Sequence, residues 1–121
     1  MEKIRVAVDK GNQVWIESFK NQDADMLADY FDEEGAILGA DGKVIEGREA
    51  VRAYLKSWMA QIGPSQFTIE TIDLYKVSDE IYEKGAYELT IENGNRYEGK
   101  YVVEWKQGLD GNYYFYRDIG I

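Results

Sequence analysis

The chain has 121 residues, enough for one domain with a real hydrophobic core. Its net charge of −9 argues against nucleic acid and anionic membranes as partners, because both require a basic surface. The sequence contains no His and no Cys, which excludes the usual zinc and copper sites, Cys–His dyads and Ser–His–Asp triads.

Apolar residues at helical spacing predict three helices. The first spans residues 3–20 and contains Gly11, which weakens a helix by about 1 kcal/mol relative to Ala, so we expect a close packing contact there. Asp23 is placed to cap a short second helix. That helix is expected to bury Met26, Leu27, Tyr30 and Phe31. A third helix follows Gly47 and is ended by Gly63-Pro64.

Strand signals occupy the rest of the chain. Asp41-Gly42 marks a hairpin between residues 35–38 and 43–46, and after the third helix the apolar pattern changes to alternation. The alternating runs cover residues 67–77, 81–92, 96–106 and 113–119. This order predicts one α+β domain over residues 1–121, with helices packed on one face of a mainly antiparallel sheet.

The hairpin at Asn93-Gly94 determines which residues of its two strands share a face of the sheet. A two-residue turn there pairs Ala86 with Tyr101. One face then carries Ala86, Glu88, Thr90, Tyr101, Val103 and Trp105, and the opposite face carries Tyr87, Leu89, Ile91, Val102 and Glu104. A slip by one residue would exchange the two sets.

Both faces of the predicted sheet carry large apolar side chains, whereas a sheet with one solvated face alternates apolar and polar residues. We therefore expect a second copy of the chain to cover the outer face through Tyr87, Leu89, Ile91 and Val102. The sequence has no apolar run of 18 residues and no signal-like apolar block near Met1, and we therefore expect a cytoplasmic location.

Six short segments, in order along nearly the whole chain, resemble one family. They are Trp15-Ile-Glu-Ser-Phe19, Asp23-Ala-Asp-Met-Leu27, Phe31-Asp-Glu-Glu-Gly-Ala-Ile37, Gly47-Arg-Glu-Ala-Val51, Gly99-Lys-Tyr-Val-Val-Glu-Trp105 and Tyr116-Arg-Asp-Ile119. The chain resembles the NTF2-like (cystatin-like α+β) superfamily, and within it the SnoaL-like and DUF4440 group related to ketosteroid isomerase. The resemblance implies a cone with a cavity inside. Three N-terminal helices would pack on a strongly curved sheet, with a small hairpin between the second and third helices.

The catalytic positions differ from those of the steroid isomerases that the chain resembles. In those enzymes a Tyr and a protonated Asp hold the oxyanion while another Asp moves the proton. The corresponding positions here are Trp15, Val103 and Ala40. The resemblance therefore argues against steroid isomerase activity.

Asp118 is the first candidate for a catalytic carboxylate. The resemblance places it, with Tyr114 and Tyr116, toward the cavity, where loss of water would raise its pKa toward the range of a general acid or base. The alternative is a structural role. In that case the ionised carboxylate would pair with Arg5, Arg48 or the indole N–H of Trp15.

Glu88 is the second candidate. With the two-residue turn it points into the same cavity, where two carboxylates could work as an acid and a base. The alternative is a solvated Glu at the edge of a strand. The acidic residues 32–34 and the pair Asp23 and Asp25 lack the calcium-loop pattern, so the sequence predicts no metal site and no cofactor.

The predicted cavity lining is mostly aromatic. It comprises Trp15, Phe19, Tyr54, Trp58, Tyr101, Val103, Trp105, Tyr114 and Tyr116. These side chains could orient a flat apolar ligand, or they could fill the cone completely. We infer a homodimer with a cavity for a small apolar molecule and leave its activity open. The alternatives are a cofactor-free isomerase, cyclase or hydrolase that uses Asp118, and a dimerisation or assembly domain.

Overall fold

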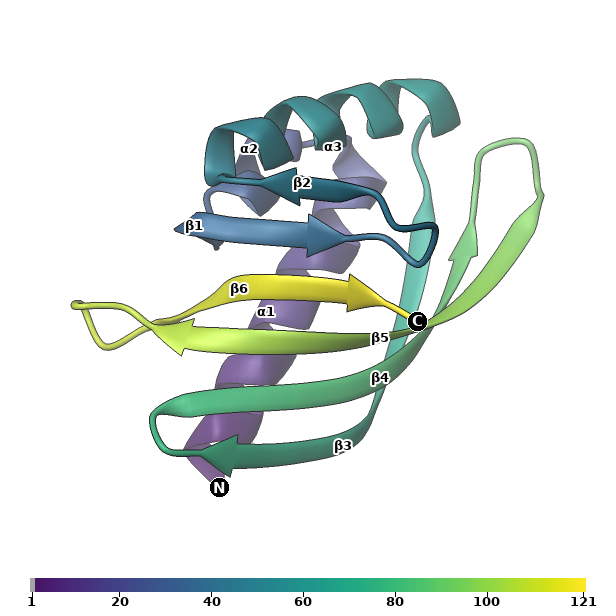
Figure 1. The fold of residues 1–121 in the computed structure, drawn as a ribbon. Coiled ribbons are helices and arrows are strands. Elements are labelled where there is room, and N and C mark those ends of the chain that lie inside the picture. Colours follow the sequence, from purple (N-terminus) through teal and green to yellow (C-terminus); the bar gives the residue numbers. More distant parts are fainter. Residues whose placement is uncertain (1) are drawn as a thin grey trace.

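The computed structural model describes residues 2–121, and it packs the helices on one side of a curved sheet (Figure 1). The helices are α1 (Glu2–Asn21), α2 (Ala24–Ala28) and α3 (Arg48–Ile62). The strands are β1 (Phe31–Leu38), β2 (Val44–Glu46), β3 (Gln66–Val77), β4 (Glu80–Thr90), β5 (Arg96–Gln107) and β6 (Tyr113–Gly120). The predicted fold class and element order are confirmed.

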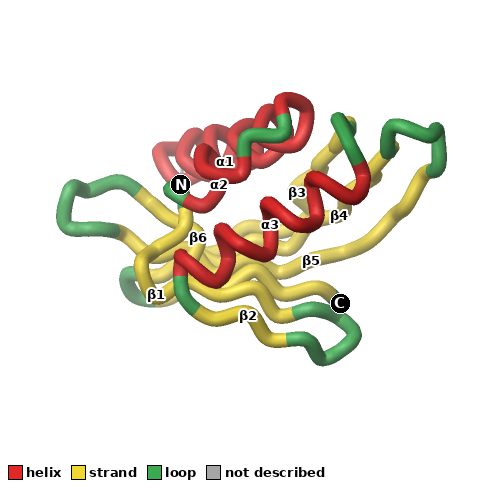
Figure 2. Tube along the Cα trace, turned by 90° about the horizontal axis from the view of Figure 1, so that it is seen from above, coloured by secondary structure: helices red, strands yellow, loops and turns green. Residues whose placement is uncertain are grey.

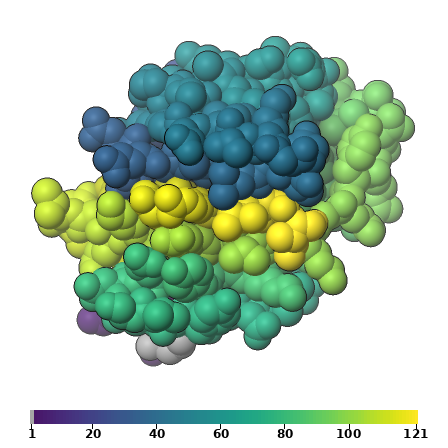
Figure 3. Space-filling model, in the orientation of Figure 1, coloured from purple at the N-terminus to yellow at the C-terminus, as the bar shows by residue number. Residues whose placement is uncertain are grey.

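The strands form a six-stranded sheet in the order β2-β1-β6-β5-β4-β3. All neighbours are antiparallel except β1 and β6, which run parallel. Seen from above, α1 and α3 lie on the same side of the sheet, which curls toward them (Figure 2). Figure 3 looks onto the opposite, outer face, where β6 crosses the molecule between β1 and β5.

Local sequence sets the helix ends as expected. The Asp23 side chain accepts a hydrogen bond from the backbone N–H of Met26 at 3.1 Å. Gly63 ends α3 with a φ of +71°, and its N–H donates to the carbonyl of Met59 at 3.0 Å. Phe31 differs from the prediction, because it begins β1 rather than continuing α2. Its ring packs 5.2 Å from that of Phe115, its partner on β6.

The core lies between α1 and the concave face of the sheet. Its largest fully buried rings are those of Phe19, Phe31, Trp105 and Phe115. A side chain at Gly11 would collide with the Trp105 ring, so the close contact predicted at this glycine is confirmed. Within residues 2–121, no helix is both long and apolar enough to cross a membrane.

The predicted register of the β4–β5 hairpin was wrong by one residue. Ala86 pairs with Lys100 instead of Tyr101. The loop has three residues, because the Gly94 N–H donates to the Ile91 carbonyl and Gly94 takes a φ of +93°. A tight turn followed by a left-handed glycine is the next most common way to close a hairpin.

The corrected register exchanges the two faces of β4. Tyr87 and Leu89 turn to the concave side, and Ile91 packs against the core. Three of the four residues predicted for the dimer face are therefore turned inward, and only Val102 stays on the outer face. Glu88 also moves to the outer face.

A bulge in β6 changes its alternation as well. Arg117 pairs with Glu104, but the next pair joins Phe115 to Trp105, so Tyr116 has no partner across the strand. Strict alternation would place Phe115 and Asp118 on opposite faces. The bulge brings both to the concave side.

Candidate functional site

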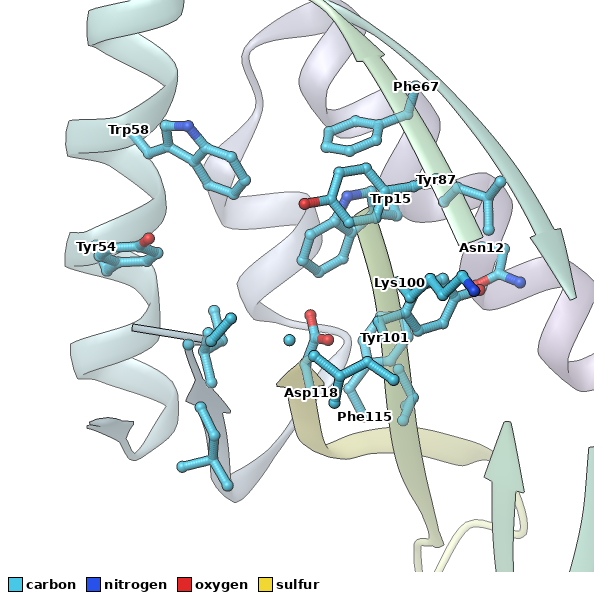
Figure 4. Close-up of a pocket in the computed structure, with 18 residues that line it drawn as sticks. Asn12, Trp15, Tyr54, Trp58, Phe67, Tyr87, Lys100, Tyr101, Phe115 and Asp118 are labelled. Carbon is cyan, nitrogen blue, oxygen red and sulfur yellow. The ribbon is translucent and has the colours of Figure 1, made fainter. Parts of the chain in front are cut away.

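The concave face of the sheet, α1 and α3 enclose a cavity of about 220 Å³ (Figure 4). Asn12 and Trp15 line it from α1, and Tyr54 and Trp58 line it from α3. The remaining wall comes from the β1–β2 hairpin and from β3 to β6. An apolar cavity of about 150 Å³ binds benzene in another protein, so this one has room for one or two fused rings.

Aromatic rings that support one another form the cavity wall. Trp15 lies edge-on to Phe67 and to Phe115, each at 6.0 Å between ring centroids. Tyr54 packs against Trp58 at 6.0 Å, and Phe67 packs against Tyr87 of β4 at 5.7 Å. Because each ring has aromatic neighbours in offset or edge-on geometry, the shape of the cavity is well defined.

The Asp118 carboxylate points into this aromatic space (Figure 4). Within residues 2–121 it has no hydrogen-bond or ion-pair partner. Two of the three expected structural partners are engaged elsewhere: Arg5 pairs with Asp9 at 3.1 Å, and Arg48 donates to the carbonyl of Phe31 at 3.0 Å. The Asp118 residue is half-buried by its accessible surface, but protein atoms surround its carboxyl group. This burial, together with the negative charge of Glu83, raises the pKa of Asp118 to about 7.

Three tyrosines of the cavity wall share a similar environment. Burial raises the pKa of Tyr54, Tyr87 and Tyr101, and the charge of Asp118 adds to the effect in each case. These phenols therefore keep their protons near neutral pH. They are suited to hydrogen bonding with a ligand rather than to acting as bases.

Glu83 is a functional candidate that the sequence reasoning missed. It is fully buried on β4. Its Oε2 atom accepts hydrogen bonds from the Tyr101 hydroxyl at 2.7 Å, the Thr71 hydroxyl at 2.8 Å and Asn12 Nδ2 at 2.9 Å. Its Oε1 atom has no partner among the described residues. One signal was available: in the alternation of β4, Glu83 shares the phase of the apolar Ile81.

The other predicted site residues divide into three groups. Trp15, Tyr54, Trp58, Tyr101 and Val103 line the cavity. Phe19 and Trp105 are fully buried in the core beside it. Tyr114, Tyr116 and Glu88 do not line it.

Each of the three excluded side chains has a local partner. Tyr114 donates to Asp110 in the β5–β6 turn. Tyr116 is the bulged residue of β6, and its ring faces the Lys106 Nζ atom at 4.9 Å and the Arg117 guanidinium at 4.4 Å. Glu88 pairs with Arg96 on the outer face, so the idea that it joins Asp118 in the cavity is not supported.

The arrangement can bind a small molecule and exchange a proton with it. A carboxyl group with a pKa of about 7 is partly protonated at neutral pH, so it can donate or accept. The aromatic walls would exclude water from a bound apolar molecule. Within the described part of the chain, no three Asp or Glu side chains are grouped to hold a metal ion.

A sequence model of the SnoaL-like domain matches residues 8–102. The chain belongs to the SnoaL-like domain family. The matched segment carries Trp15, Glu83 and Tyr101 and ends before Asp118. No curated protein sequence gives a significant match to this SnoaL-like domain.

Solved structures show the same fold. A domain of unknown function with a cystatin-like fold from Nostoc punctiforme PCC 73102 superimposes with a TM-score of 0.85 at 11% identity, over 96% of this chain and 75% of that one. A protein of unknown function from Mycobacterium tuberculosis gives 0.81 at 23% identity, over 99% and 72%. A conserved protein from Planctomyces limnophilus DSM 3776 gives 0.82 at 15% identity, over 100% of both chains. These likenesses show that the SnoaL-like domain has the cystatin-like fold.

Proposed function

We propose that this SnoaL-like domain binds a small, flat, largely apolar molecule inside the cone, with a polar group of that molecule at Asp118. The proposal rests on one observation: an unpaired carboxyl group faces an open cavity with aromatic walls. Protein interiors are close-packed, and voids larger than a water molecule are few. A cavity of about 220 Å³ beside a carboxyl group therefore favours a ligand site over an incompletely filled core.

Tryptophan fluorescence can test this binding with 2-naphthol, a flat two-ring molecule with one hydroxyl group. Because Trp15 and Trp58 line the cavity, we expect saturable quenching on titration. Naphthalene, which lacks the hydroxyl, should bind more weakly because it cannot bond to Asp118. Equal affinity for the two probes would remove Asp118 from the proposal.

A matched pair of substitutions locates the binding. Ile37→Phe adds volume inside the cavity, whereas Val44→Phe adds similar volume at an exposed position of β2. We expect Ile37→Phe to weaken 2-naphthol binding at least tenfold and Val44→Phe to leave it unchanged. Thermal unfolding of both variants confirms that they are folded. Binding that is insensitive to Ile37→Phe would place the probe outside the cone and refute the proposal.

A second candidate function is cofactor-free proton transfer by Asp118. The observation that favours it is the pKa of about 7, which lets the same carboxyl group accept and return a proton near neutral pH. On a ketone, the carboxylate would take a proton from the carbon next to the carbonyl. The resulting enolate would then recover a proton at that carbon from the carboxylic acid. Tyr54 and Tyr87 could donate hydrogen bonds to the carbonyl oxygen.

Exchange of the α-hydrogens of 2-tetralone in D₂O, followed by NMR, tests this candidate. We expect the wild-type chain to accelerate exchange and Asp118→Asn to lose at least 100-fold of that acceleration, the usual range for a general base. Glu88→Gln, on the outer face, is the matched control and should keep full activity. A wild-type chain that binds 2-tetralone without accelerating exchange would be a binding module.

The third possibility is an assembly domain, which needs no space inside the cone, and the open cavity argues against it as the main function. We retain the homodimer as a proposal with a revised face. Val102 and Ile119 pair across β5 and β6, and Tyr75 stacks on Tyr82 at 5.8 Å between β3 and β4. Together they would supply the apolar part of an interface between two outer faces.

A further inference from the structure

Beside the candidate ligand site lies the buried carboxylate of Glu83, which touches no solvent. We propose that Glu83 is a positioning residue for that site: it fixes the phenol hydrogen of Tyr101 and, through its charge, keeps a proton on Asp118. The inference rests on the proposed ligand site, because the proton on Asp118 decides which polar group a ligand must bring.

The hydrogen bonds around Glu83 all come from donor groups. Three donors from three different elements, Asn12 of α1, Thr71 of β3 and Tyr101 of β5, meet at the single atom Oε2. An ionised carboxylate only accepts hydrogen bonds, and it is the form that such a set of donors favours. The Tyr101 hydroxyl has only one hydrogen, and it donates that hydrogen in its bond to Glu83. On the cavity side, the oxygen of Tyr101 is left as an acceptor.

Glu83 and Asp118 are linked through the sheet. Each pairs directly with Val103, one from β4 and the other from β6, so the two acidic residues lie two strand spacings apart on the concave face. That spacing corresponds to about 10 Å between the backbones. At such a distance in a protein interior, one negative charge still opposes the formation of another.

Several other groups surround Asp118. The charged or titratable ones that line the cavity are Tyr54 of α3, Tyr87 of β4, and Lys100 and Tyr101 of β5. On the β1–β2 hairpin, Lys43 Nζ faces the Tyr54 ring at 5.5 Å and the charge of Asp41 acts on Tyr54. The side chains that α1 contributes, Asn12 and Trp15, are uncharged. The two influences that raise the pKa of Asp118 are burial and then the charge of Glu83, which supports the geometric argument.

A proton on Asp118 determines which class of ligand the cavity can bind. A protonated Asp118 donates a hydrogen bond, so the ligand should present a neutral acceptor there, such as a carbonyl or an ether oxygen. The fixed Tyr101 oxygen and the charge of Glu83 both disfavour an anion in the cavity. We therefore assign the cavity to neutral, largely apolar carbonyl or ether compounds rather than to carboxylic acids.

Carbon-13 NMR of the Asp and Glu side chains of the ligand-free protein tests the proposal. The midpoint of Asp118 should lie at about pH 7 in the wild-type chain. In Glu83→Gln it should fall by about one pH unit, the effect of one unit charge at this distance. Glu88→Gln is the control and should not move it. An unchanged midpoint in Glu83→Gln would overturn the proposal, whatever the ligand assays show.

Two further measurements separate charge from packing. Tyr101→Phe removes the phenol but keeps the carboxylate, so the midpoint of Asp118 should fall by clearly less than in Glu83→Gln. A fall of equal size would mean that packing, not charge, is responsible. If Glu83→Gln does not fold, the Glu83 signal of the wild-type chain at pH 7 decides. A carboxylate signal that moves as Asp118 titrates supports the inference, and a carboxylic-acid signal overturns it.

Discussion

Tyr101 of β5 and Gly85 of β4 are directly paired, and the phenol of Tyr101 lies where a side chain on Gly85 would otherwise be. The Tyr101 hydroxyl can therefore cross β4 and reach Glu83 at 2.7 Å. Tyr87 lies across Gly99 in the same way, in the reverse direction between the same two strands. Each glycine makes room for a tyrosine that lines the cavity.

Gly85→Ala should destabilise the protein by about 1–3 kcal/mol, the usual cost of overpacking a filled site. The added methyl group would displace the phenol of Tyr101 and weaken its hydrogen bond to Glu83. Urea unfolding measures the change. Ala86→Ser, the next residue on the outer face, should cost less than about 0.5 kcal/mol. Similar losses in the two variants would contradict this account of Gly85.

Asp118→Asn should change how stability depends on pH. The pKa of Asp118 is about 7 in the folded chain, against an ordinary value of 3.8. Between these values the folded state binds more protons than the unfolded state, so the wild-type chain loses stability as the pH rises through this window. The Asn variant lacks this ionisation. Its stability relative to the wild type should therefore rise between pH 4 and pH 7, by at most about 4 kcal/mol.

Chemical unfolding of both proteins at several pH values measures that difference. Solvent that reaches Asp118 through the cavity should reduce the change below its upper limit. Asp73→Asn, at an exposed position of β3, provides the control for a general effect of charge removal. A stability difference that is independent of pH would show that Asp118 has an ordinary pKa in the folded protein.

Arg52 should hold α2 against α3. Its guanidinium donates to Asp25 at 2.8 Å, to Asp29 at 2.7 Å and to Glu49 at 3.1 Å. Arg52→Met should cost about 1 kcal/mol in low salt and less at high ionic strength, because the three carboxylates are largely exposed. Arg5→Met, which breaks a single exposed pair, should cost under about 0.5 kcal/mol. A loss at Arg52 that salt does not reduce would point to packing of its methylene groups instead.

Sedimentation at micromolar concentration should show a dimer if two outer faces pair. Val102→Glu places a charge at the centre of the proposed interface and should shift the population to monomer. Val44→Glu makes the same change at an exposed position of β2 and should leave the dimer intact. A wild-type chain that sediments as a monomer would end the dimer proposal without affecting the ligand site.

The sequence by itself determined the elements and the fold family, because those signals are local. Asp23 caps α2, Gly63-Pro64 ends α3, and alternation identifies the strands after it. The aromatic content of the cavity followed from the same reading, since Trp15 and Tyr54 needed only a helical face to be placed.

Only the tertiary structure decided which strand residues face the cavity. Asn93-Gly94 is compatible with loops of two or three residues, and burial of Tyr87 and Leu89 against distant elements selects the longer one. The bulge that admits Asp118 depends likewise on how β6 pairs with β5. The buried carboxyl group of Glu83 accepts a hydrogen bond from Asn12, which lies 71 residues earlier in the chain. Strand register and buried hydrogen bonds are set by contacts between residues far apart in the sequence, so no local segment contains the free energy that decides them.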